Sequence, residues 1–150
     1  MWKWKALAMA GVLFGVGGIS WGQAQGKAAP GIYELRIYRA EPGKRDALAQ
    51  RFATRTAAIY ERHGITNVGF FTPEVSNKEL GIDAENTFIY ILGFPSREER
   101  DKRLKGRASD PEFRKVVIEA ERDPQTKLIS TAHIVPMVPN SPYSAIRITP

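Results

Sequence analysis

The sequence predicts an α+β fold of the ferredoxin-like type, with the element order β-α-β-β-α-β and a four-stranded antiparallel sheet that carries its helices on one face. Three observations indicate this fold. Residues 32–39 alternate with a period of two, as in a strand. Residues 44–63 change to helical spacing. Residues 86–94 form a nearly continuous apolar run that Pro95 ends, which predicts a strand buried on both faces.

The first half of the domain follows from turn and period signals. Glu41-Pro42-Gly43 ends the first strand, and the helix over residues 44–63 stops where Gly64 can take a left-handed conformation. Residues 65–72 form the second strand, in which Gly69 indicates a bulge or a close backbone approach. Residues 74–85 are polar and lack a regular pattern, so we expect a hairpin loop leading into the strand over residues 86–94.

The second half contains two capped helices and a last strand. Ser96, with Glu99 three residues later, forms a capping box that starts a short helix ending near Gly106. Asp110-Pro111 starts a further helix, with Asp110 as the cap and the proline in the first turn. Residues 127–135 form the fourth strand, and residues 137–150 are a proline-rich C-terminal arm. The sheet face without helices would expose Tyr38, Phe70 or Phe71, and alternate residues over 88–94. This would be a large apolar patch, so we expect a homodimer through sheet faces.

The N-terminus has the features of a secretory signal peptide. Residues 1–24 contain Lys3 and Lys5 but no acidic residue, and an apolar run over residues 6–21 precedes small residues at positions 22 and 24. We therefore predict cleavage near Ala24 and an exported protein, periplasmic or secreted, of bacterial type that is not transmembrane after cleavage. An uncleaved anchor is the alternative. Residues 25–31 read as a flexible lead-in to the folded domain.

Composition excludes several kinds of chemistry. The chain has 150 residues, a net charge of +6 and no cysteine, which excludes disulfides, thiol catalysis and thiolate-bound clusters. No Walker A loop or dinucleotide-binding glycine motif follows a strand, and two unclustered histidines make no metal site. The basic residues over 97–107 alternate with acidic ones and have no aromatic neighbours, so we predict no nucleic-acid partner. No cofactor is expected.

Four stretches resemble a known family in order and spacing: Tyr33-Glu34-Leu35-Arg36-Ile37-Tyr38 with Pro42-Gly43-Lys44, Tyr60-Glu61-Arg62-His63-Gly64 running into Val68-Gly69-Phe70-Phe71, Ser96-Arg97-Glu98-Glu99-Arg100, and Ser109-Asp110-Pro111-Glu112-Phe113. Together they resemble the NIPSNAP domain, over residues 32–136. The resemblance implies a dimeric α+β barrel, as in small monooxygenases and haem-dependent chlorite dismutases. It implies no settled biochemical activity, and the roles of mitochondrial family members do not transfer to a chain with an export-type start.

The candidate ligand-binding residues centre on the first strand. Its two faces carry different side chains: Tyr33, Leu35 and Ile37 on one, and Glu34, Arg36 and Tyr38 on the other. If the first face packs on helices, the second points into the barrel between subunits. Two interpretations remain open there: an ion-pair network that fixes the dimer, or a pocket for an anionic or carbonyl-bearing ligand with Arg36 as a forked donor.

Other residues could complete such a pocket. Tyr60 and Tyr90 are candidates, although aromatic residues at these positions are usually core. His63 either interacts with the helix C-terminus or acts as a base or ligand, and His133 is either a hydrogen-bonded sheet residue or a haem ligand. No catalytic residue can be assigned. The preferred interpretation is a homodimer that binds a small molecule in its barrel; the alternatives are a cofactor-independent monooxygenase-like enzyme and a non-catalytic structural or interaction protein.

Overall fold

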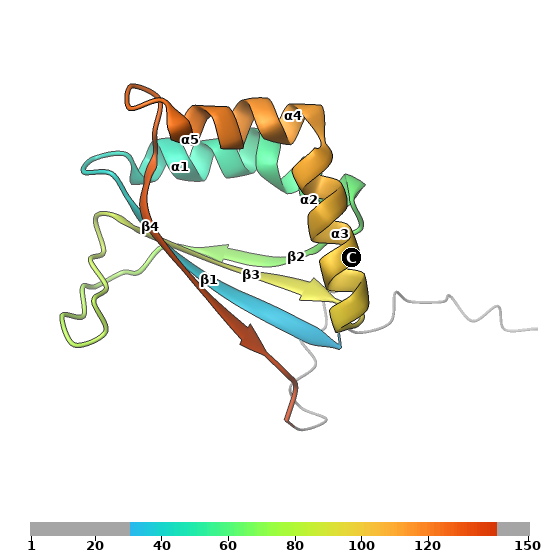
Figure 1. Cartoon of the computed structure of the whole chain (residues 1–150). Helices are drawn as coiled ribbons and strands as arrows, with labels where there is room; N and C mark the ends of the chain where they lie inside the picture. The colour runs from blue at the N-terminus through green and yellow to red at the C-terminus, as the bar shows by residue number, and fades with distance from the viewer. Residues whose placement is uncertain (1–30, 141–150) are drawn as a thin grey trace, which may run out of the picture.

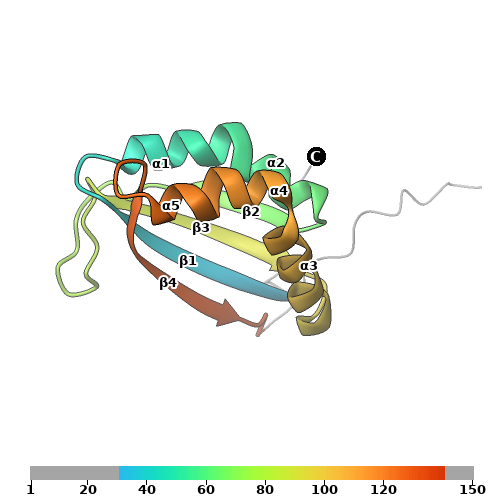
Figure 2. The ribbon, with the colours of Figure 1, turned by 45° about the horizontal axis from the view of Figure 1, so that its top comes forward.

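A computed structural model describes residues 31–140, which form one antiparallel sheet in the order β2-β3-β1-β4 with helices against one face (Figures 1 and 2). The elements are β1 (Ile32–Ala40), α1 (Arg45–Arg51), η1 (Phe52–Thr56), α2 (Ala57–Arg62), β2 (Thr66–Phe71), β3 (Thr87–Phe94), α3 (Arg97–Ser109), α4 (Pro111–Phe113), η2 (Arg114–Glu119), α5 (Ala120–Arg122) and β4 (Ile129–Met137). This confirms the predicted α+β ferredoxin-like order. The predicted signal peptide, nearly all of the lead-in and most of the C-terminal arm lie outside the described residues.

The helix predicted over residues 44–63 is one continuous rod made of α1, η1 and α2. Its middle, η1, is a π-helical segment, a form that is often found near functional sites. The helix ends at His63, and Gly64 follows with φ of +71°, the left-handed conformation predicted from the sequence. Figure 2 shows this rod lying beside the α4-η2-α5 rod above the sheet, while α3 crosses one end of the sheet.

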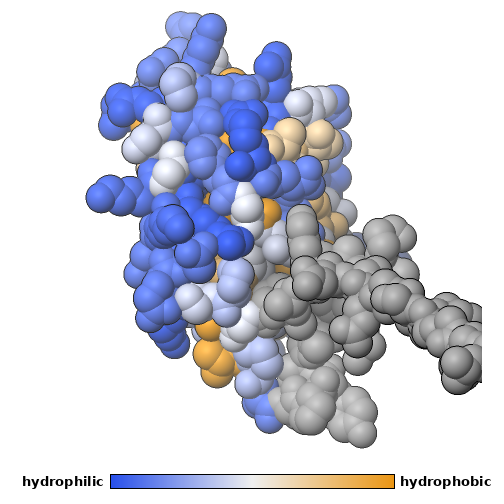
Figure 3. Space-filling model, turned by 90° about the vertical axis from the view of Figure 1, so that its right-hand side faces the viewer, coloured by the Kyte–Doolittle hydropathy of each residue, from blue (hydrophilic) through white to orange (hydrophobic). Residues whose placement is uncertain are grey.

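The helix α3 is longer than predicted, because it passes through Gly106 and ends at Ser109. The cap itself is confirmed: Ser96 Oγ accepts a hydrogen bond from Glu99 N at 3.2 Å. A Cβ on Gly106 would lie 3.3 Å from His63 Nδ1. Glycine at this position therefore permits close approach between α3 and the end of α2, and does not mark a helix end. The solvent side of the α3 end of the molecule is mainly hydrophilic (Figure 3).

The strands differ from prediction mainly at their ends. The register between β2 and β3 shifts between Asn67 and Gly69, which confirms the irregularity expected there. The last strand, β4, begins at Ile129 and continues through Pro136 to Met137. A proline is tolerated because β4 is an edge strand, where a missing N–H need not break the ladder.

The prediction of which sheet face carries the polar residues of β1 is wrong. Glu34, Arg36 and Tyr38 point toward the helices and not into a space between subunits. Their β3 partners are Leu92, Tyr90 and Phe88, and all three partners are buried beneath the helices. These large β3 side chains fill the helix side of the sheet, and the antiparallel register places the even-numbered residues of β1 beside them.

The open face carries a different apolar set from the one expected. Tyr38 and Phe70 lie on the helix side, while the open face holds Leu35, Ile37, Phe71, Ile89, Ile91 and Val135. On β3, the residues facing the helices are fully buried, whereas Ile89 and Ile91 are half-buried, so the strand is not buried on both faces as predicted. Within residues 31–140, no helix is long and apolar enough to span a membrane.

Candidate functional site

The polar centre of the protein is a buried carboxylate held by two arginines. Glu34 has no exposed surface, and Arg36 is only 5% exposed. Arg36 donates from Nε and Nη2 to Glu34 Oε2 at 2.9 and 2.5 Å. From α3, Arg100 Nε donates to the other oxygen, Oε1, at 2.5 Å. Because both carboxylate oxygens are occupied by guanidinium groups, burial of this charge is compensated.

Next to the ion pair of Glu34 and Arg36, tyrosine hydroxyls form a short hydrogen-bonded chain. Tyr90 Oη donates to Tyr38 Oη at 2.7 Å. Arg36 Nη1 makes longer contacts with the same two oxygens, at 3.4 and 3.5 Å. Tyr38 thus accepts from both neighbours, which leaves its own proton available for a further acceptor.

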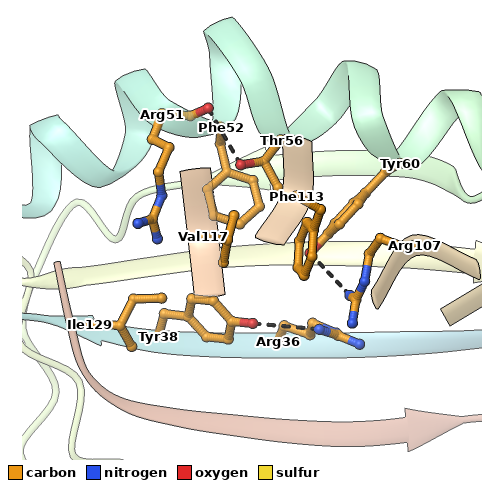
Figure 4. A pocket seen from close by; sticks show the side chains of 10 residues that line it. All are labelled: Arg36, Tyr38, Arg51, Phe52, Thr56, Tyr60, Arg107, Phe113, Val117 and Ile129. Carbon is orange, nitrogen blue, oxygen red and sulfur yellow. Dashed lines mark hydrogen bonds between the residues drawn. The ribbon is translucent and has the colours of Figure 1, made fainter. Parts of the chain in front are cut away.

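A cavity of about 90 Å³ lies between β1 and the two helical rods (Figure 4). Its lining residues are Arg36, Tyr38, Arg51, Phe52, Thr56, Tyr60, Arg107, Phe113, Val117 and Ile129. Phe52 and Thr56 bound the π-helical segment η1, and both are buried. The π-helical segment thus places the Phe52 ring and the Thr56 hydroxyl, which are four residues apart, on the same wall of the cavity.

Arg51 enters the cavity from the end of α1. Its side chain is 10% exposed, and its Nη1 lies 2.6 Å from Glu121 Oε1. Glu121 is therefore the ion-pair partner of Arg51, although none of the three Arg51 nitrogens makes a well-aligned hydrogen bond among the described residues. Glu121 uses its other oxygen to accept from the backbone N–H groups of Leu128 and Ile129. Buried donors without partners are rare and require an explanation.

Arg107 reaches the same cavity from α3. Its guanidinium carbon lies 4.4 Å from the centre of the Phe113 ring and 5.5 Å from that of Tyr60, both within cation–π range. Its Nη1 makes a long contact of 3.5 Å with Tyr60 Oη, and its Nε is buried without a partner. No carboxylate pairs with Arg107 in the part of the chain that the structure describes.

Most polar groups of the lining are donors. Three guanidinium groups and the hydroxyls of Tyr38 and Tyr60 line the cavity, and no carboxylate does. The hydroxyl of Thr56 also lines it but donates to Arg51 O at 3.4 Å. Burial raises the pKa of Tyr60 above its ordinary value, and it raises the pKa of Tyr90 well above it. Burial works to lower the pKa of Arg36, but the surrounding tyrosines and Glu34 outweigh it and the pKa is raised. These groups keep their protons at neutral pH, and such a lining suits an anion.

A second, larger hollow of about 430 Å³ lies on the open sheet face under the hairpin loop, lined by Ile37, Arg39, Leu80, Gly81, Thr87, Thr131 and His133. Arg39 Nη2 already donates to Gly81 O at 2.7 Å. None of the residues that line it has a buried polar side-chain atom without a partner. The smaller cavity therefore has the stronger requirement for a ligand.

The candidate residues from the sequence separate into two places. Arg36, Tyr38 and Tyr60 line the cavity, with Glu34 and Tyr90 directly behind them. His63 lies elsewhere: its Nε2 is 2.8 Å from Asp110 Oδ2 at the surface between α2 and α4. It occupies the C-cap of α2, as predicted for a helix-end histidine.

Seven further lining residues were not among the sequence candidates: Arg51, Phe52, Thr56, Arg107, Phe113, Val117 and Ile129. In the sequence, Arg107 belongs to the basic run over residues 97–107, whose alternation with acidic residues is typical of a solvated helix. A spacing signal did exist on α3, because Arg100, Leu104 and Arg107 recur at helical intervals and share one face. Among residues 31–140, no group of three His, Asp or Glu side chains could hold a metal ion.

The fold and the site define a small α+β protein with a donor-lined cavity between one face of its sheet and its helices. The NIPSNAP family model matches residues 33–142, and the chain belongs to the NIPSNAP family. No curated protein gives a significant match to the chain.

Solved structures of NIPSNAP proteins from bacteria share this fold. A NIPSNAP family protein from Agrobacterium tumefaciens str. C58 is 22% identical with a TM-score of 0.62, covering 77% of this chain and 98% of that one. A second protein from that strain, described as having unknown function, is 26% identical with a TM-score of 0.59, covering 74% and 91%. A NIPSNAP-like domain protein from Burkholderia xenovorans is 22% identical with a TM-score of 0.59, covering 73% and 85%.

Proposed function

We propose that this NIPSNAP-family protein is an exported homodimer that binds a small anionic molecule, of the carboxylate class, in the cavity between β1 and the helical rods. The observation that carries the proposal is the set of buried guanidinium nitrogens without hydrogen bonds, in a cavity whose lining residues include no carboxylate. Arg107 has no carboxylate partner among the described residues, and Arg51 pairs with Glu121, which is not a lining residue. An anion would satisfy these donors through charge-assisted hydrogen bonds, which are stronger than neutral ones.

The test compares a carboxylate with a neutral molecule of the same shape. Isothermal titration calorimetry and thermal denaturation at constant ionic strength would measure acetate against acetamide. We expect acetate to bind and to raise the melting temperature, because only the charged ligand pairs with the guanidinium groups, and acetamide to do neither. Equal responses, or none, would refute the proposal.

A variant pair locates the binding. Arg107→Gln removes a guanidinium that has no carboxylate partner among the described residues, so the variant should fold and bind acetate about tenfold more weakly. Arg114→Gln is the matched control, because Arg114 is exposed on the outer surface of η2 and lies outside the cavity. If both variants weaken acetate binding equally, the site is not this cavity.

The open sheet face supports the homodimer. Phe71, Ile89, Ile37 and His133 form one row across it by register, and Phe71 is 51% exposed. Sedimentation velocity should show a dimer for the native protein and a monomer for Phe71→Arg, since a charge there would face the partner sheet. Ala58→Arg, on the exposed side of α2, should remain dimeric. A monomeric native protein would contradict this part of the proposal.

Export is tested separately. Expression in a bacterium, cell fractionation and N-terminal sequencing should give a periplasmic or secreted protein that begins at Gln25. A membrane-bound protein that begins at Met1 would instead favour the uncleaved anchor.

A further inference from the structure

We infer that the cavity takes a dianion with two separate acidic groups, a dicarboxylate of two or three carbons, with one end bound by Arg51 and the other by Arg36 and Arg107. The inference rests on the proposed function and specifies the ligand class of that same site.

The guanidinium groups are at two ends of the cavity. In Figure 4, the guanidinium of Arg51 lies on one side of Phe52 and Val117, and those of Arg36 and Arg107 lie together on the other. Buried nitrogens without a hydrogen-bond partner occur at both ends: all three guanidinium nitrogens of Arg51 at one end, and Nε of Arg107 at the other. A single compact anion at one end would leave the donors of the other end without an acceptor.

Charge balance favours two negative charges. Four guanidinium groups at and behind the cavity, those of Arg36, Arg51, Arg100 and Arg107, face two carboxylates, Glu34 and Glu121. The one further carboxylate in contact with this group, Asp101, is 69% exposed and therefore largely screened by water. Over the whole cluster two positive charges remain, and a dianion would neutralise both. Glu121 already balances the charge of Arg51, so the excess charge lies at the end of Arg36 and Arg107, and the Arg51 end offers N–H donors without hydrogen bonds.

Volume limits the length of the ligand. The cavity of about 90 Å³ is smaller than the cavity of about 150 Å³ that accepts benzene, and it corresponds to about three water molecules. Oxalate and malonate are of this order, whereas longer dicarboxylates exceed it. The middle of such a ligand would lie between the apolar side chains of Phe52 and Val117. The free proton of Tyr38 supplies one more donor, since its oxygen already accepts from Tyr90.

Isothermal titration calorimetry of the purified protein at constant ionic strength tests the inference with oxalate, malonate, succinate, acetate and inorganic phosphate. We expect oxalate or malonate to bind at least about tenfold more tightly than acetate, because a second charged group is engaged, and succinate to bind more weakly than malonate. If acetate binds as tightly as both dicarboxylates, or phosphate binds more tightly than they do, the two-ended inference is wrong while the anion site stands. If no anion binds, the proposed function fails as well.

A paired substitution removes one end of the site without leaving a buried charge unpaired. Arg51→Gln combined with Glu121→Gln neutralises both members of the ion pair. We expect this variant to lose the preference for malonate over acetate, with the ratio of their affinities falling to about one, while acetate still binds at the other end. Arg114→Gln, outside the cavity, should keep the native ratio. A paired variant that folds with the native melting temperature and retains the preference would overturn the assignment of Arg51.

Discussion

The buried carboxylate of Glu34 offers the most direct test of how this protein is held together. Replacing Glu34 with alanine leaves Arg36, which is 5% exposed, without its charge partner beneath the helices. Arg100 loses the same partner, but its side chain is 29% exposed and can be hydrated. The penalty therefore falls mainly on Arg36.

The expected loss is large for a domain of this size. Removing one partner of a buried ion pair costs about 3–5 kcal/mol, because the remaining charge stays desolvated. Domains are typically stable by about 5–15 kcal/mol, so Glu34→Ala should lose about a fifth or more of the free energy of unfolding. At about 4 °C per kcal/mol, the melting temperature should fall by about 12–20 °C.

Urea denaturation followed by circular dichroism measures this loss. Glu119→Ala, which removes an exposed carboxylate on η2, is the control and should change stability by less than about 0.5 kcal/mol. The double variant Glu34→Leu with Arg36→Met should lose less than half as much as Glu34→Ala, because it leaves no charge on β1 unpaired. A single variant that loses under about 1 kcal/mol, or a double variant no more stable than the single, would refute this reasoning.

Three other predictions concern caps and titrating groups. Ser96→Ala should lower stability by about 1 kcal/mol in thermal denaturation, and Ser96→Thr should restore most of it, since Ser96 Oγ accepts from Glu99 N at the start of α3. Hydrogen bonds from Arg62, and next from His63, hold the pKa of Asp110 below its usual value, so its charge stabilises the fold above about pH 4 and this stabilisation is lost as pH falls through the folded-state pKa. Urea unfolding at a series of acidic pH values should therefore fall less steeply for Asp110→Asn, which keeps the helix cap; parallel curves would contradict this. Because burial raises the pKa values of two tyrosines, Tyr60 and Tyr90, an ultraviolet titration should show two phenols that stay protonated above about pH 10 until the protein unfolds, and full titration in the folded state would contradict it.

Period and capping signals predicted the order of elements because they depend on neighbours along the chain. The alternation over residues 32–39, the Ser96 cap and Gly64 after the first helix all have local causes. Element ends were less predictable. Gly106 predicts a helix end from local signals, yet it lies inside α3, where the close approach of His63 explains the glycine.

Only part of the cavity lining could be predicted from the sequence, because Arg36 and Tyr38 stand out as polar residues at alternate positions of a strand. The face they would occupy was not visible. Both faces of β1 could be covered in principle, and only pairing with β3 shows that Tyr90 and Phe88 lie beside them under the helices. A slip of one residue in that register would have turned the same side chains to the open face.

The sequence by itself determined a small α+β domain without cysteine chemistry. It also determined a strand face with charged side chains, which need charge partners if that face is buried. Only the tertiary structure decided which residues become the partners of these charges. Arg100 reaches Glu34 from α3, and Arg51 and Arg107 meet Arg36 around one cavity, although they are far apart in the chain. Such contacts depend on how helices pack over a sheet, and local sequence patterns do not encode the distance between two elements that meet only after folding.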